Sequence, residues 1–155
     1  FFIEGGFARC QSRGEEIDVL KRGCLLHLVI AQSEEGLSTP EVFSQCTVPS
    51  HPETINGILS AVTTGNPTEV ASCLHNRLSE PAAYLAPSIR GIEKTMMEAG
   101  CLASAMSGSG SAVFGICRNS DQARQIAGLL RARQLGWVRA TSTILKTNHL
   151  PLLAS

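Results

Sequence analysis

Residues 102–117 read LASAMSGSGSAVFGIC, two short apolar segments separated by a loop of glycine and serine. Short apolar segments joined by a glycine-containing turn are typical of a β-hairpin. We therefore predict neighbouring strands over 102–106 and 112–117, with the loop exposed at one end of a sheet.

Helices are predicted on both sides of this hairpin, because apolar residues recur there every three or four positions. The C-terminal helix spans 119–134 and opens with Asn119 and Gln122 at capping spacing. Of two earlier helices, one ends at Gly100 and the other begins at Asn66-Pro67. The apolar stripe of the 119–134 helix is Ala123, Ile126, Ala127 and Leu130. The helix that ends at Gly100 carries Leu85, Ile89, Ile92, Met96 and Ala99, and the one that begins at Asn66-Pro67 carries Val70, Cys73, Leu74 and Leu78.

Two more helices are predicted nearer the N-terminus. Ser38 or Thr39 can cap a short helix that has Pro40 in its first turn. Ser50 and Glu53 have the spacing of a capping box, and the apolar stripe of Ile55, Ile58, Leu59 and Val62 follows them.

The remaining segments favour strands. We predict a hairpin over 6–20, a central strand over the apolar run 24–31, and a last strand over 137–145. Strands at both ends with helices between them indicate an α+β fold, in which one antiparallel sheet is backed by helices.

Composition argues against several classes of partner. The formal net charge is zero and aromatic residues make up 5% of the chain, so neither nucleic acid nor an anionic membrane surface is an expected partner. We expect no membrane span and no secretory signal. The first residue is Phe1, which suggests a cut inside a longer protein. The six cysteines are expected to be small buried residues of a reducing cytoplasm.

The loop over Ser107, Gly108, Ser109 and Gly110 is the best candidate for a ligand site. Its glycines allow a close approach of backbone to ligand, and successive amides in such a turn can form an anion-binding nest that suits a phosphate. The loop lacks the Lys of a Walker A motif and the third glycine of a dinucleotide fingerprint, and no G-x-S-x-G elbow occurs. A tight hairpin with nothing bound remains an equal alternative from these residues alone.

The parts needed for phosphoryl transfer are not all present. The only two aspartates are Asp18 and Asp121, which have structural explanations in a hairpin and in a first helical turn. We therefore assign no catalytic residue and no metal ligand to this chain.

Residues 99–115 resemble the third sequence motif of the GHMP kinases, the family of galactokinase, homoserine kinase, mevalonate kinase and phosphomevalonate kinase. Residues 1–8, 13–15 and 36–43 resemble the branch of this family whose substrate is a cytidine diphosphate-linked methylerythritol. Residues 75–82 resemble the Asn-Asp-Leu-Glu signature of that branch, although Arg77 stands where Asp is usual and Ser79 is inserted. We assign no role to this last segment.

The resemblance implies a ferredoxin-like C-terminal domain over 1–155 that includes a leading hairpin, 1–20, and binds the small-molecule substrate. The N-terminal domain, which would bind ATP and supply the catalytic Lys, is absent, and the catalytic Asp would lie just before Phe1. ATP and Mg²⁺ are expected only for the full-length enzyme, in a bacterial cytoplasm or a plastid stroma. This chain alone is expected to be inactive.

The resemblance also implies roles for single residues. Phe43 would lie against the cytosine ring, with Thr39 and Pro40 shaping the site, and Ser107 to Gly110 would face phosphate. Two alternatives stay open: another substrate of the family, such as homoserine or mevalonate, or a non-catalytic α+β domain that binds a small molecule.

Overall fold

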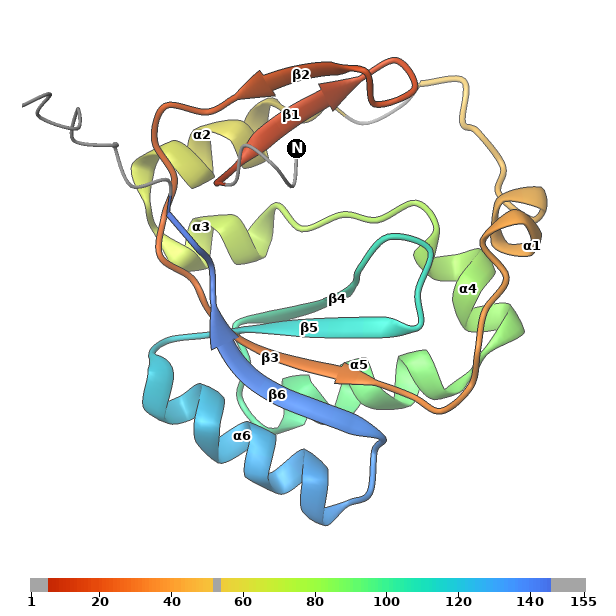
Figure 1. Cartoon of the computed structure of the whole chain (residues 1–155), viewed down its shortest axis with the longest axis vertical. Helices are drawn as coiled ribbons and strands as arrows, with labels where there is room; N and C mark the ends of the chain where they lie inside the picture. The colour runs from red at the N-terminus through yellow and green to blue at the C-terminus, as the bar shows by residue number, and fades with distance from the viewer. Residues whose placement is uncertain (1–5, 52–53, 146–155) are drawn as a thin grey trace, which may run out of the picture.

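The computed structural model describes residues 6–51 and 54–145. Within these ranges the chain forms a four-stranded sheet, a separate hairpin and several helices (Figure 1). In chain order the elements are β1 (Ala8–Gln11), β2 (Glu16–Val19), β3 (His27–Gln32), α1 (Thr39–Ser44), α2 (Asn56–Thr64), α3 (Pro67–Ser72), α4 (Ser79–Leu85), α5 (Ser88–Glu98), β4 (Ala103–Met106), β5 (Ala112–Cys117), α6 (Ser120–Ala132) and β6 (Trp137–Ser142).

The main sheet has the strand order β4-β5-β3-β6, and all three pairings are antiparallel. Its strands are connected as strand, helices, strand, strand, helix, strand, which is the ferredoxin-like arrangement. The α+β fold expected from the sequence is confirmed. The apolar run at β3 explains its central place, because Val29 and Ala31 are fully buried between β5 and β6.

Helices α5 and α6 pack against one face of this sheet. Side chains alternate between the two faces of a strand, so Val113 and Cys117 of β5 join this core while Ile116 faces the other way. The helices contribute their predicted stripes, and Ile89, Met96 and Leu130 are fully buried.

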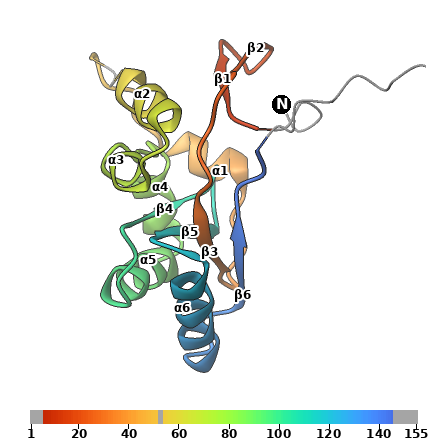
Figure 2. The same ribbon diagram turned by 90° about the vertical axis from the view of Figure 1, so that its left-hand side faces the viewer.

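A second, smaller core lies on the opposite face. Ile116 packs there with Val62 of α2 and Val70 of α3, and Phe7 and Leu20 from the β1–β2 hairpin lie against the same cluster. Figure 2 shows α2 and α3 lying above α5, with β6 on the opposite side of the molecule. The hairpin forms its own two-stranded sheet, as predicted over 6–20.

Two predicted helix caps are present. The Asn119 side chain accepts from the Gln122 amide at 2.9 Å, and Gln122 accepts from the Arg118 amide at 2.7 Å. Asn66 accepts from the Thr68 amide at 3.0 Å. Ser38 is the cap residue of α1 but makes no side-chain cap bond, and Glu53 of the predicted capping box lies outside the described residues.

Several predicted boundaries are wrong. The predicted helix carrying Leu85 through Ala99 is two helices, because the non-helical backbone of Ala86 (φ −133°, ψ 87°), immediately before Pro87, ends α4. The helix beginning at Asn66-Pro67 stops at Ser72, so Leu78 belongs to the start of α4. Two strands also have other bounds than expected, since β3 begins at His27 and β6 ends at Ser142.

No helix in the described ranges is long and apolar enough to cross a membrane.

Candidate functional site

The glycine–serine loop joins β4 to β5 at one end of the sheet, beside α4 (Figure 1). Its base is closed by two backbone hydrogen bonds, from the Ser107 amide to the Ala112 carbonyl at 2.8 Å and from the Gly110 amide to the Ser107 carbonyl at 3.0 Å. In the described part of the chain, the amides of Gly108 and Ser109 donate to no protein acceptor. These two N–H groups are therefore available to a ligand.

Both loop glycines occupy the left-handed region of backbone space, with φ of 58° at Gly108 and 88° at Gly110. L-residues rarely adopt this conformation. The two positions differ in their surroundings: a Cβ at Gly108 would meet nothing within 4 Å, whereas one at Gly110 would lie 2.8 Å from Met106 Sδ and 2.9 Å from Leu37 Cδ1. Gly110 is thus needed for packing as well as for conformation.

Helix α1 contacts the loop directly. The Thr39 hydroxyl lies 2.8 Å from the Ser109 hydroxyl, although the two residues are 70 positions apart in the sequence. Leu37, just before α1, lies beneath Gly110. The two groups of residues singled out by the sequence, Thr39-Pro40-Phe43 and Ser107 to Gly110, therefore meet at one end of the sheet.

Phe43 is solvent-exposed, with 58% of its surface accessible, while its neighbour Val42 is buried. Residues four apart share a face of a helix, so Phe43 lies on the face of α1 that carries Thr39. Pro40 occupies the first turn of the helix. The ring is not part of the core and can accept a planar ligand beside the loop.

Asn76, in the segment between α3 and α4, also contacts the loop. Its side-chain amide donates to the carbonyls of Met106 at 2.8 Å and Gly108 at 2.9 Å. Sequence reasoning missed this residue, although the segment 75–82 resembles a family signature. These bonds join residues at least 30 positions apart, and no local pattern reports such a contact.

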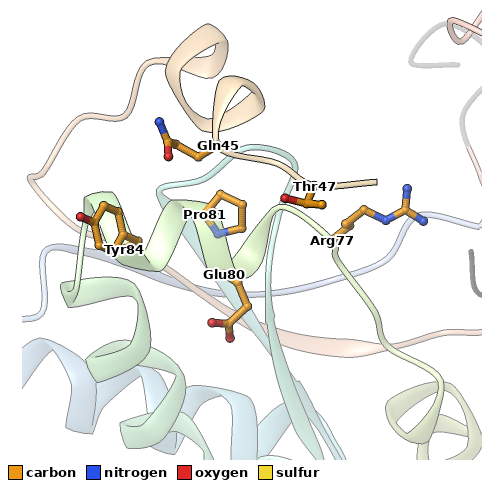
Figure 3. A pocket seen from close by; sticks show the side chains of 6 residues that line it. All are labelled: Gln45, Thr47, Arg77, Glu80, Pro81 and Tyr84. Atoms are coloured by element: carbon orange, nitrogen blue, oxygen red, sulfur yellow. The ribbon is translucent and has the colours of Figure 1, made fainter. Parts of the chain in front are cut away.

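An open pocket of about 390 Å³ lies between α1 and α4 (Figure 3). Tyr84 projects from α4 with 79% of its surface exposed, and Glu80 is paired with Arg90. The lining residues are Gln45, Thr47, Arg77, Glu80, Pro81 and Tyr84. Arg77 thus lines this pocket at the position where the family signature has Asp. Sequence reasoning did not identify the pocket, because it forms only when α1 packs on α4.

Four described groups have a shifted pKa, the carboxyl of Glu93 and the thiols of Cys24, Cys101 and Cys117. Burial raises the pKa of the Glu93 carboxyl, and the Met106 backbone amide and Arg90 oppose this shift only in part. Contact with the Cys117 thiol, 3.9 Å away, raises the pKa of the Cys101 thiol, and burial adds to the effect. Cys101 and Cys117 therefore behave as core residues, as does buried Cys24. Cys10 is exposed, so the expectation of burial is wrong there.

The aspartates have structural partners. Asp18 accepts a hydrogen bond from Gln11 across the β1–β2 hairpin, and Asp121 pairs with Arg124 at 2.5 Å in the first turn of α6. Among the described residues, no group of three His, Cys, Asp or Glu side chains could hold a metal ion.

Comparison with known proteins identifies the family. The family described as "GHMP kinases C terminal" matches residues 58–133. The 4-diphosphocytidyl-2-C-methyl-D-erythritol kinase of Corynebacterium jeikeium is 37% identical over 138 residues, covering 82% of this chain and 38% of its own length. The enzyme of the same name from Clavibacter michiganensis is 31% identical over 156 residues, covering 93% of this chain and 50% of its own length.

Solved structures show that the fold is shared with kinases of this family. A crystal structure of 4-(cytidine 5'-diphospho)-2C-methyl-D-erythritol kinase is 29% identical with a TM-score of 0.71, covering 87% of this chain and 48% of that one. Homoserine kinase from Cytophaga hutchinsonii has the same TM-score at 16% identity, covering 92% and 49%, and so shares the fold. The chain spans about half the length of these proteins or less. From its sequence, its fold and these relatives, the chain belongs to the GHMP kinase family.

Proposed function

We propose that this chain is the substrate-binding C-terminal domain of a kinase that uses ATP to phosphorylate the 2-hydroxyl of 4-diphosphocytidyl-2-C-methyl-D-erythritol. The observation that carries the proposal is the contact between Thr39 and Ser109. It brings an exposed aromatic ring and a loop with two unused amides to one end of the sheet. A cytidine diphosphate derivative combines the two chemistries that these groups recognise, a planar base and phosphate oxygens.

Phe43 would stack on the cytosine ring, and Thr39 and Pro40 would set the position of that ring by shaping the start of α1. The amides of Gly108 and Ser109 would donate to phosphate oxygens, as backbone nests do. Stacking and amide donation hold the substrate in place without any proton transfer. These residues therefore bind and orient the substrate, and that is the part of the reaction that we assign to this chain.

The remaining parts belong to the rest of the kinase. Asp18 and Asp121 are held in structural contacts, so we assign the catalytic base, the Lys and the ATP site to an N-terminal domain outside this chain. We also assign Mg²⁺ to the full-length enzyme, where it would accompany the phosphates of ATP. We place the reaction in a bacterial cytoplasm or a plastid stroma.

Steady-state kinetics of the full-length enzyme with ATP test this proposal. The cytidyl substrate should be phosphorylated with a kcat/KM far above that for homoserine or mevalonate. Turnover of homoserine or mevalonate in preference to the cytidyl substrate would reassign the enzyme within its family. Binding of the cytidyl substrate without turnover of any of the three would favour a non-catalytic role.

A further inference from the structure

The side chain of Asn76 makes three hydrogen bonds, and two of them lie at the base of the glycine–serine loop. Its Nδ2 donates to the carbonyls of Met106 and Gly108, and its Oδ1 accepts from the Leu78 amide at 3.0 Å. The orientation of this amide is unambiguous. Exchanging oxygen and nitrogen would set an acceptor against two carbonyl oxygens and a donor against an N–H.

We propose that Asn76 is a positioning residue that aims the Ser109 amide at a bound phosphate, an inference that rests on the proposed function. The carbonyl of Gly108 and the N–H of Ser109 belong to one planar trans peptide unit and point in opposite directions. Holding the Gly108 carbonyl against Asn76 therefore turns the Ser109 N–H away from Asn76. That N–H is one of the two loop amides with no protein acceptor.

The second bond of Asn76 ties the loop to the sheet. The Met106 carbonyl shares its peptide unit with the Ser107 N–H, which donates to Ala112 across the hairpin. Asn76 thus holds one carbonyl at the end of β4 and another two residues further on. The backbone between these two carbonyls runs through Ser107 and Gly108. Gly108 has no side chain with which to resist rotation, so the bonds from Asn76 restrict a stretch of backbone that is flexible on its own.

Thr39 holds the same loop from another element. Its hydroxyl contact fixes the Ser109 side chain, while Asn76 fixes the Ser109 amide through Gly108. Donors that are already oriented bind an anion without first losing conformational freedom, and this preorganisation favours both binding and catalysis. A hydrogen bond to the carbonyl also polarises the peptide and makes its N–H a better donor.

A purely structural role has to be separated from this one, because the bond to Leu78 helps to start α4. Asn76→Asp in the full-length kinase makes the separation. Aspartate keeps an acceptor for the Leu78 amide, but it replaces both donors with an oxygen that repels the two carbonyls. The matched control is Asn119→Asp, since the Asn119 side chain accepts from the Gln122 amide at the start of α6 and makes no described contact with the loop.

We expect Asn76→Asp to lower kcat/KM for the cytidyl substrate by about 10- to 100-fold, the scale of a displaced binding group, and to lower the melting temperature only modestly, since two hydrogen bonds are lost while the bond to Leu78 is kept. Asn119→Asp should leave both quantities unchanged. Asn76→Ser adds no charge, and its single hydroxyl donor on a shorter side chain cannot bond both carbonyls, so this variant should lose activity in the same direction. Wild-type kinetics in both Asn76 variants would overturn the proposal and leave Asn76 as a helix-start residue only.

A readout that needs no turnover keeps this test separate from that of the proposed function. In the full-length protein, titration with inorganic pyrophosphate should shift the amide NMR signals of Gly108 and Ser109. The shifts should be lost or weakened in Asn76→Asp and retained in Asn119→Asp. Equal shifts in all three proteins, or none in the wild type, would overturn the role of Asn76 whatever substrate the kinase uses.

Discussion

At the scale of single residues, Phe43 is the strongest test of substrate choice. Stacking of an aromatic ring on a base contributes roughly 1–3 kcal/mol, about one to two decades in affinity. We expect Phe43→Ala in the full-length enzyme to raise the KM for the cytidyl substrate by about that factor and to leave the KM for ATP unchanged. Because the ring is 58% exposed, the melting temperature should barely move. Early melting with normal substrate binding would show that Phe43 serves packing alone.

Phe114 provides the matched aromatic control. It is half-buried and packs against the core shared with α2 and α3. Truncation of a fully buried phenylalanine costs about 3–5 kcal/mol, and the partial exposure of Phe114 makes a smaller cost the expected one. Phe114→Ala should therefore reduce the melting temperature while the KM for the cytidyl substrate stays near the wild-type value.

Glu93 predicts a pH dependence of stability. Because burial raises the pKa of its carboxyl, the folded state holds this proton more tightly than the unfolded state does. The resulting stabilisation is complete below the unfolded pKa and is lost as pH rises through the folded pKa. Glu93→Gln should match the wild type in acid and melt at a higher temperature near neutral pH, as thermal scans across pH will show.

Exposed Glu98, which lies 3.8 Å from Lys94, is the control for this measurement, and Glu98→Gln should leave the pH dependence unchanged. If Glu93→Gln melts below the wild type at neutral pH, then the contacts of the carboxylate with the Met106 amide and Arg90 outweigh its burial.

At the scale of elements, the two glycines of the loop between β4 and β5 have different roles. Gly108 is needed for its backbone conformation, and Gly110 is needed for packing as well. A Cβ fits at Gly108 but would lie within 3 Å of Met106 and Leu37 at Gly110. Forcing an ordinary residue into the left-handed region costs about 1–2 kcal/mol. Gly108→Val should therefore lose most turnover and melt slightly early, whereas Gly110→Val, which adds the clash with Met106 and Leu37, should melt several degrees earlier still. Equal melting temperatures in the two variants would contradict this distinction.

At the scale of the whole molecule, this chain should not catalyse alone. Its aspartates are committed to Gln11 and Arg124, and it spans about half the length of its relatives or less. The purified chain, mixed with ATP, magnesium and the cytidyl substrate, should form no phosphorylated product above background. Co-expression with an N-terminal domain of the family is the positive control. Steady turnover by the chain alone would show that a catalytic group has been misplaced.

Local patterns in the sequence determine much of this fold. The apolar residues of α6 recur with the period of a helix, and the side chains of β5 alternate between two faces as in a strand. Each pattern therefore predicts both the type of element and the face that is buried. Asn66 and Asn119 encode helix starts for an equally local reason, a side chain bonding to an amide two or three residues ahead. The glycine–serine loop was likewise visible, since only glycine adopts its backbone angles freely.

The assembly of the site was decided by tertiary structure alone. Thr39 meets Ser109 across 70 positions, and Asn76 reaches Met106 and Gly108 across 30 and 32. The exposure of Phe43 depends on how α1 lies against the rest of the chain, and the pocket beside Tyr84 exists only where α1 meets α4. Such contacts follow from the packing of whole elements on the sheet. Sequence periodicity records which face of an element is buried, but not which distant residue lies against it.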